Sequence, residues 1–109
     1  FSNIYALGDA SSTPNAKTGA AVRKQVPVLV EQLVSQIYHQ KPSPDQYHGY
    51  GSCPLVTGYG KLVMAEFDYE NKRVETFPFD QSKERLSMYL LKTQVLPRLY
   101  WNFILKGMM

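Results

Sequence analysis

The chain has 109 residues, a net charge of +3 and 44% hydrophobic residues. This length permits one domain with a modest core, and the composition is that of a folded chain rather than a disordered one. The charge is too small to call for nucleic acid as a partner. No apolar run reaches the roughly 18 residues that span a bilayer. Because the chain has one cysteine, any disulfide chemistry needs a second thiol from elsewhere.

The first part of the chain is predicted to form a strand, a turn and a long helix. Phe1–Leu7 is a short apolar run that stops at Gly8-Asp9, as a buried strand does before a turn. Phe1 follows no initiator Met or leader pattern, which indicates a piece cut from a longer protein. The helix is expected over about Ala16–His39, with Pro27 kinking or dividing it. Its apolar face should carry Val22, Val26, Leu29, Leu33 and Ile37.

The middle of the chain is predicted to form a small antiparallel sheet. Two prolines in residues 41–52 mark a linker, and a glycine-rich loop around Cys53 follows. Residues 62–69 alternate as a strand does, with Val63, Ala65, Phe67 and Tyr69 on one face and Glu66 and Asp68 on the other. A turn at residues 70–72 should return the chain along residues 73–77 as a hairpin. Residues 55–59 are a candidate third strand.

The last part, residues 83–109, is predicted to form two helices, the second beginning at Pro97. It is basic, because its only acid is Glu84, and it is rich in large apolar residues. Such a segment suits the interface of a membrane. The alternative is a terminal helix pair that packs on its own domain or on a further part of the protein. Periodicity alone leaves both interpretations open.

The surroundings of Cys53 make it the first candidate for chemistry. Four glycines fall within twelve residues around it, at positions 49, 51, 58 and 60, and tyrosines stand between them. Glycine lets the backbone approach a flat or bulky group closely. Cys53 is therefore a candidate redox centre, although a lone cysteine is also commonly a small buried hydrophobic residue. His39 and His48 have no partners at metal-ligand spacing, so no metal site is expected.

A second candidate site is the Gly8-Asp9 turn. An apolar strand that ends there places a carboxylate at the edge where ligands of α/β folds bind. The next helix then offers free amides and the positive end of its dipole to an anionic group. The alternative is a plain turn in which Asp9 accepts hydrogen bonds from local amides.

The Gly8-Asp9 motif resembles the second flavin-binding stretch of the disulfide reductase superfamily, whose members carry two dinucleotide-binding domains. By that resemblance Asp9 holds the ribityl chain of FAD, with Gly8 forming the turn. Lys17, at the start of the next helix, is then placed to stabilise negative charge on the reduced flavin.

The stretch Gly49–Tyr59, with its Ser-Cys-Pro-Leu-Val-Thr-Gly-Tyr run, is similar to the C-terminal part of the sulfide:quinone oxidoreductase family, in its eukaryotic-like branch. Residues 65–69, 75–90 and 99–102 extend the likeness over nearly the whole chain. The resemblance implies a flavoenzyme that oxidises sulfide with a cysteine pair and passes the electrons through FAD to quinone. Cys53 matches the C-terminal member of the pair. By the resemblance, one cysteine of the pair takes up a persulfide and the other, as a thiolate, reduces the flavin. The partner cysteine and the Gly-rich FAD pyrophosphate motif are not in this chain.

The expected fold is therefore α+β, a fragment of a two-dinucleotide-binding-domain flavoprotein. Residues 1–40 should end the FAD-binding domain, 41–80 hold the redox-cysteine loop and hairpin, and 81–109 form amphipathic helices. The expected partners are quinone, sulfide, a sulfur acceptor, a membrane surface and the missing N-terminal portion. The membrane is the bacterial plasma membrane or the mitochondrial inner membrane. Candidates for the quinone or membrane contact are Tyr59, Tyr100, Trp101 and Phe103.

Two other hypotheses remain open at this point. The chain is a membrane-docking or oligomerisation module without catalysis, because a large uncovered apolar face recruits partners, homo-oligomerisation included. Alternatively it is part of a type II NADH:quinone reductase, which shares the Gly-Asp turn and the membrane-facing tail. That enzyme class needs no thiol at position 53, so Cys53 argues against it.

Overall fold

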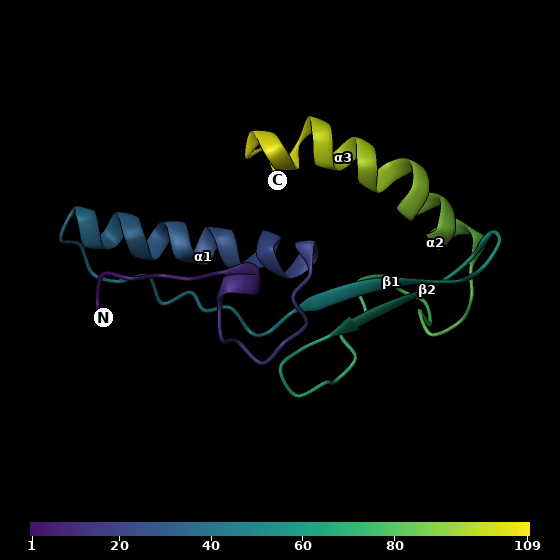
Figure 1. The fold of residues 1–109 in the computed structure, drawn as a ribbon, viewed down its shortest axis with the longest axis horizontal. Helices are drawn as coiled ribbons and strands as arrows, with labels where there is room; N and C mark the ends of the chain where they lie inside the picture. The colour runs from purple at the N-terminus through teal and green to yellow at the C-terminus, as the bar shows by residue number, and fades with distance from the viewer. The chain divides into compact units, whose positions relative to one another are not determined.

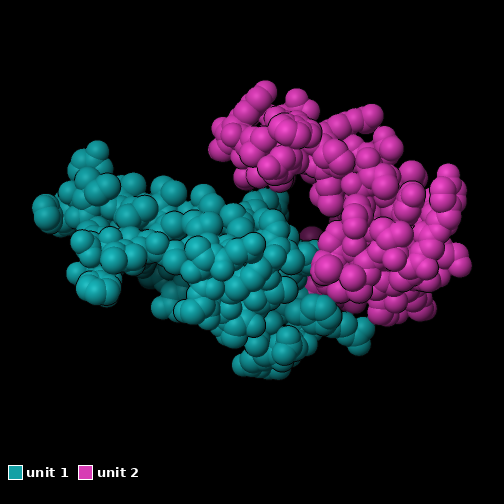
Figure 2. All heavy atoms as spheres, viewed as in Figure 1, with its two compact units in different colours: residues 1–52, 67–74 teal, residues 53–66, 75–109 magenta.

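A computed structural model describes residues 1–109 and confirms an α+β fold of helices and one small antiparallel sheet (Figure 1). The chain forms two compact units, coloured separately in Figure 2. The first unit comprises residues 1–52 and 67–74, and the second comprises residues 53–66 and 75–109. No helix combines the length and the apolar character that crossing a bilayer requires.

The predicted N-terminal strand is absent from the structure. Leu7 has extended backbone angles, φ −143° and ψ 169°, but the one sheet of the chain contains only β1 and β2. An extended segment becomes a strand only when its amides and carbonyls pair with a neighbouring strand, and these have none. The side chains of Ile4 and Tyr5 are accordingly exposed rather than buried. The segment ends in a single 3-10 turn, η1 (Gly8–Ala10).

Helix α1 (Gly19–Ile37) is the main element of the first unit. Thr18 is its N-cap, and the Thr18 hydroxyl accepts a hydrogen bond from the Ala21 amide at 3.2 Å. Pro27 lies inside the helix without ending it. The predicted apolar face is wrong in part, because Val26 and Ile37 are exposed (40% and 67%) whereas Ala21 and Gln25 are buried. The buried side of α1 is thus centred on Ala21 and Gln25 rather than on Val26 and Ile37.

The sheet is a hairpin of β1 (Gly51–Gly58) and β2 (Lys61–Phe67), joined by Tyr59-Gly60. Gly60 has φ +71°, a left-handed conformation that glycine adopts without strain. The predicted pairing of β2 with residues 73–77 is wrong, because only the isolated bridge Phe67–Arg73 forms there. The tight turn at Tyr59-Gly60 makes β1 the partner of β2. The candidate third strand is therefore one of the two real ones.

The core of the second unit lies on one face of β2. It consists of Leu62, Met64 and Met88, with Phe77, Phe79, Tyr89 and Leu91 packed around them. The buried side chains of β2 are thus Leu62, Met64 and Glu66, whereas Val63 and Ala65 are half-buried and Phe67 is exposed. Glu66, which the alternating pattern grouped with Asp68 opposite Val63, Ala65 and Phe67, therefore lies on the face that packs.

The C-terminal segment is helical almost without interruption, as Figure 1 shows from green to yellow. Helix α2 (Leu86–Leu90) passes into a π-helical turn, η2 (Leu91–Val95), then into α3 (Leu96–Asn102) and a last 3-10 turn, η3 (Ile104–Lys106). Pro97 lies in the first turn of α3, as predicted, directly after the π-helical turn. In η2 the Leu96 amide donates to the Leu91 carbonyl, five residues back. The two predicted helices are therefore joined by a π turn.

Candidate functional site

The Gly8-Asp9 turn packs on the first turns of α1. Gly8 has φ +60°, and the Gly8 amide donates to the Gln25 side-chain oxygen at 2.9 Å. A Cβ on Gly8 would lie 3.2 Å from Val22 Cγ2, so any other residue is both strained and crowded there. This hydrogen bond accounts for the buried polar side chain of Gln25 on the packing side of α1. The next residue, Asp9, carries an exposed carboxylate.

The N-terminus of α1 belongs to the same unit as this turn. Lys17, just before the helix, donates to both the backbone carbonyl and the hydroxyl of Thr13, the latter at 2.9 Å. Lys17 is exposed, so its ammonium is held by the loop but open to solvent. At Gly19 a Cβ would meet nothing within 4 Å. Gly19 is itself exposed, so the chain at the start of α1 is open to solvent.

Cys53 lies within β1 and its side chain is exposed. Side chains alternate along a strand, so Cys53, Leu55 and Thr57 share one face of β1, and all three are exposed. Of the alternating residues, Ser52, Pro54 and Gly58 are half-buried and Val56 is exposed. The interpretation of Cys53 as a small buried hydrophobic residue is thus contradicted.

Two contacts within the second unit hold the Cys53 strand, one to η2 and one to the loop before α2. The Lys92 ammonium in η2 donates to the Pro54 carbonyl at 2.9 Å, one residue from the cysteine. Glu84 receives a hydrogen bond from the Thr57 side chain and lies 3.4 Å from Lys61 Nζ. The hydrogen bond from Thr57, with a further one from Lys61, lowers the pKa of the Glu84 carboxyl below its ordinary value of 4.5.

The four aromatic residues expected at a quinone or membrane contact lie in the second unit with exposed rings. Tyr59 stands at the hairpin tip, fully exposed, with its ring centroid 6.4 Å from that of Tyr89. Tyr100 and Trp101 lie edge to face at 5.3 Å in α3, and Phe103 follows them. Leu96, Leu105, Met108 and Met109 are exposed as well. The helical segment beyond η2 is therefore covered by little of its own unit.

Sequence reasoning missed a cluster of tyrosines in the first unit, in which Tyr47 is half-buried and Tyr69 is partly exposed. The Tyr47 hydroxyl donates to the Tyr50 carbonyl and accepts from the Asn15 side chain at 2.6 Å. The Tyr47 and Tyr69 rings meet edge to face at 5.6 Å. Burial, reinforced by the neighbouring Tyr69, raises the pKa of Tyr47 above its ordinary value of 10.0, against hydrogen bonds to Gln25 and Asn15 that lower it. Both tyrosines line a cavity of about 260 Å³ beside α1.

A second group that sequence reasoning missed is the buried carboxylate of Glu66. It accepts hydrogen bonds from the Thr76 amide at 2.9 Å, from the Thr76 hydroxyl at 2.7 Å and from the Gln81 side-chain amide at 2.6 Å. The one available signal was a charged residue between Met64 and Phe67 in an otherwise apolar strand. That signal is weak, since charged residues alternate on many half-exposed strands.

The candidate residues thus fall into two groups. Gly8, Asp9 and Lys17 belong to the first unit, beside the start of α1. The second unit holds the thiol and the exposed aromatic side chains, namely Cys53, Tyr59, Tyr100, Trp101 and Phe103.

No family model matches the chain. Three curated proteins are similar to it over 98% of its length. They are the mitochondrial sulfide:quinone oxidoreductases of Mus musculus, 48% identical over 107 residues, of Dictyostelium discoideum, 43% identical over 109, and of Schizosaccharomyces pombe, 43% identical over 112. The chain spans 24% of the length of each of these relatives.

Proposed function

Because the chain belongs to the sulfide:quinone oxidoreductase family, as its C-terminal part, we propose that it contributes to a flavoenzyme that oxidises sulfide and reduces quinone. The observation that carries this proposal is the single exposed thiol of Cys53, on a strand whose sequence resembles that of the family. A thiol that takes part in disulfide exchange must be reachable by its attacker, and the exposed face of β1 meets that requirement.

In the proposed reaction Cys53 is one member of a disulfide whose partner lies elsewhere in the complete protein. Hydrosulfide attacks one sulfur of the disulfide, an S–S bond to sulfide forms, and the bond between the two cysteines breaks. One cysteine then carries a persulfide and the other is a thiolate. A sulfur acceptor removes the outer sulfur atom, and the disulfide re-forms with loss of two electrons. Quinone is the final acceptor of those electrons.

The residues of the first unit fit FAD as the intermediate electron carrier. The exposed carboxylate of Asp9 is free to accept hydrogen bonds from ribityl hydroxyls, and Gly8 fixes the turn that presents it. The open start of α1 at Gly19 and the positive end of the helix dipole, with the Lys17 ammonium, favour negative charge on a bound group. When bound, FAD supplies a two-electron relay between the cysteine pair and quinone.

We propose a peripheral association with the mitochondrial inner membrane, where quinone is dissolved. The exposed side chains of Tyr100, Trp101 and Phe103, together with Lys92, Arg98 and Lys106, give the C-terminal segment the aromatic and basic character of an interfacial helix. The relatives are named as mitochondrial proteins. The same exposed apolar surface favours the second candidate function, a docking or oligomerisation module without catalysis.

The test is Cys53→Ser in the complete protein. We expect sulfide-dependent quinone reduction to be abolished while the flavin absorbance per protein stays at the wild-type level, since Cys53 is not among the residues assigned to FAD. Thr57→Ser, a conservative change on the same exposed face of β1, is the matched control and should turn over normally. Turnover retained in Cys53→Ser would remove the thiol from the mechanism and leave the docking module as the better account.

A further inference from the structure

Burial of the Glu66 carboxylate in β2 costs free energy, which the groups around it must offset. The side chain is only 5% exposed, and burial of a carboxylate is unfavourable unless hydrogen bonds replace its water. Three donors do so, two from Thr76 and one from Gln81. An apolar residue of similar size would fill the same place without this cost, so the carboxylate is expected to select one arrangement of the chain around it.

Gln81 extends that arrangement into the loop of residues 75–82. It is 1% exposed, the most buried polar residue of the chain. Besides donating to Glu66, the Gln81 side chain accepts from the Phe77 amide at 2.8 Å, and the Gln81 amide donates to the Glu75 carboxylate at 3.2 Å. Both side-chain polar atoms of Gln81 therefore have partners, and the partner of the side-chain nitrogen is the Glu66 carboxylate.

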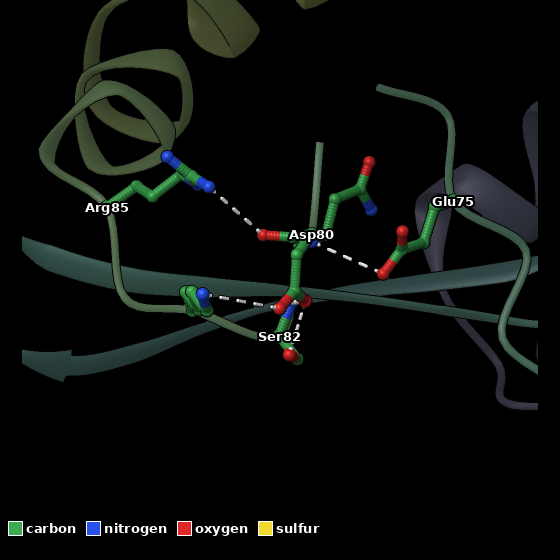
Figure 3. Close-up of polar contacts among 6 residues, drawn as sticks. Glu75, Asp80, Ser82 and Arg85 are labelled. Atoms are coloured by element: carbon green, nitrogen blue, oxygen red, sulfur yellow. Dashed lines mark hydrogen bonds and ion pairs between the residues drawn. The ribbon is translucent and has the colours of Figure 1, made fainter. Parts of the chain in front are cut away.

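The loop continues from Gln81 into a second attachment to β2. Figure 3 shows Ser82 donating to the Asp80 carboxylate and the Arg85 guanidinium reaching the Asp80 carbonyl, the latter at 3.4 Å. The Arg85 amide donates to the Leu62 carbonyl at 3.0 Å, and helix α2 begins at the next residue. The loop is thus fixed on β2 at two points, the Leu62 backbone and the Glu66 side chain.

We infer that Glu66 is a positioning residue for the Cys53 strand. Its carboxylate fixes the register between β2 and the loop that leads into α2, and β1 is held by its pairing with β2. Cys53 stands on the exposed face of this hairpin, and Glu66 holds the buried face in place. The turnover test of this inference rests on the proposed function. The reactivity of the Cys53 thiol does not, because it reports directly on the position of the strand.

The chemistry of an amide at position 66 gives the test. A carboxylate offers acceptors to all three donors, whereas a glutamine offers one oxygen and turns its NH₂ toward at least one of them. Glu66→Gln in the complete flavoprotein is therefore expected to lower kcat by roughly tenfold, as misplaced reacting groups do, with KM for sulfide and quinone within about twofold. The rate of Cys53 alkylation in the reduced protein, followed by peptide mass spectrometry, should change at least about threefold, in keeping with a displaced thiol.

The double variant Glu66→Gln with Gln81→Glu restores one acid and one amide to the pair. Its kcat and its rate of Cys53 alkylation should return most of the way to the wild-type values. Thr76→Val removes only the hydroxyl donor. It should change kcat and the rate of Cys53 alkylation in the same direction as Glu66→Gln, but by a smaller factor. Glu70→Gln is the matched control, because this carboxylate is exposed in the loop after β2.

Kinetics and Cys53 labelling of Glu66→Gln and Thr76→Val that match the wild type would overturn the inference. So would loss of turnover in parallel with loss of flavin, without recovery in the double variant, since that result describes general damage to the fold. A wild-type protein that shows no sulfide-dependent quinone reduction contradicts the proposed function instead. In that case the change in Cys53 labelling still decides whether Glu66 positions the strand.

Discussion

Glu84 is the acid whose environment gives a directional pH prediction at the scale of a single residue. The hydrogen bond from Thr57, followed by that from Lys61, holds the pKa of Glu84 below 4.5. A carboxyl with a lowered pKa in the folded state contributes stability that is present above its unfolded pKa, and that contribution disappears as the pH falls through the folded pKa. The contribution of Glu84 should therefore be complete above about pH 4.5 and be lost below it.

A carbon-13 NMR titration of the Glu84 carboxyl in the protein measures this directly. We expect a midpoint below 4.5 in the wild type and a shift back toward 4.5 in Thr57→Val, which removes the main donor. A Glu84 midpoint that Thr57→Val leaves unchanged would mean that the Thr57 hydroxyl does not bind this carboxylate in solution.

Single residues differed in how far sequence alone could identify them. Cys53 stood out because cysteine is rare in this chain and its glycine-rich surroundings are unusual. Glu66 did not, because the rule that charges face solvent places it on the wrong side of β2. Only the tertiary contacts with Thr76 and Gln81, ten and fifteen residues away, make its burial tolerable.

At the scale of elements, the capping of α1 yields a prediction. The Thr18 hydroxyl accepts from the Ala21 amide at 3.2 Å and so satisfies one of the free donors of the first turn. Thr18→Ala should destabilise this end of the helix by about 1 kcal/mol. Because the first turn of α1 packs on Gly8, the turn that presents Asp9 should loosen with it.

Amide hydrogen exchange is the measurement for this variant. The amides of Ala21 and Val22 should exchange roughly fivefold faster in Thr18→Ala, as about 1 kcal/mol implies, whereas those in the last turn of α1 should not change. Thr18→Ser keeps the hydroxyl and is the control that should behave as the wild type. Equal exchange in all three proteins would show that the cap does not govern this end of the helix.

The elements were predictable to the extent that local pattern determines them. The helix expected over residues 16–39 forms over Gly19–Ile37, because its apolar spacing and its N-cap are local signals. The hairpin was placed one strand too late, since Glu70-Asn71-Lys72 and Tyr59-Gly60 are both acceptable turns. In the structure β1 pairs with β2 through the second turn, and Phe77 and Phe79 pack on Leu62 and Met64 instead of extending the sheet. The N-terminal strand failed for a different reason, as strand formation depends on a partner that no local pattern reveals.

At the scale of the whole molecule, each unit buries little of its apolar surface. The buried hydrophobic core of the chain consists of Ala21, Leu62, Met64 and Met88 alone. Exposed apolar side chains continue along α1 at Val26, Val30 and Val34, and along the C-terminal helical segment. Such extended apolar surfaces are typical of segments that pack on other protein or on lipid. This agrees with a chain that spans 24% of the length of its relatives.

The central claim is that Cys53 is one half of a redox pair in a sulfide-oxidising flavoprotein. The most direct measurement is the covalent state of Cys53 in the complete protein, obtained by alkylation and peptide mass spectrometry before and after addition of sulfide. We predict that Cys53 in the oxidised protein is bonded to a second cysteine and protected from alkylation. Sulfide should open that bond and leave an added sulfur on one member of the pair. A Cys53 thiol that is free and alkylated in the oxidised protein, while sulfide still reduces quinone, would contradict the account.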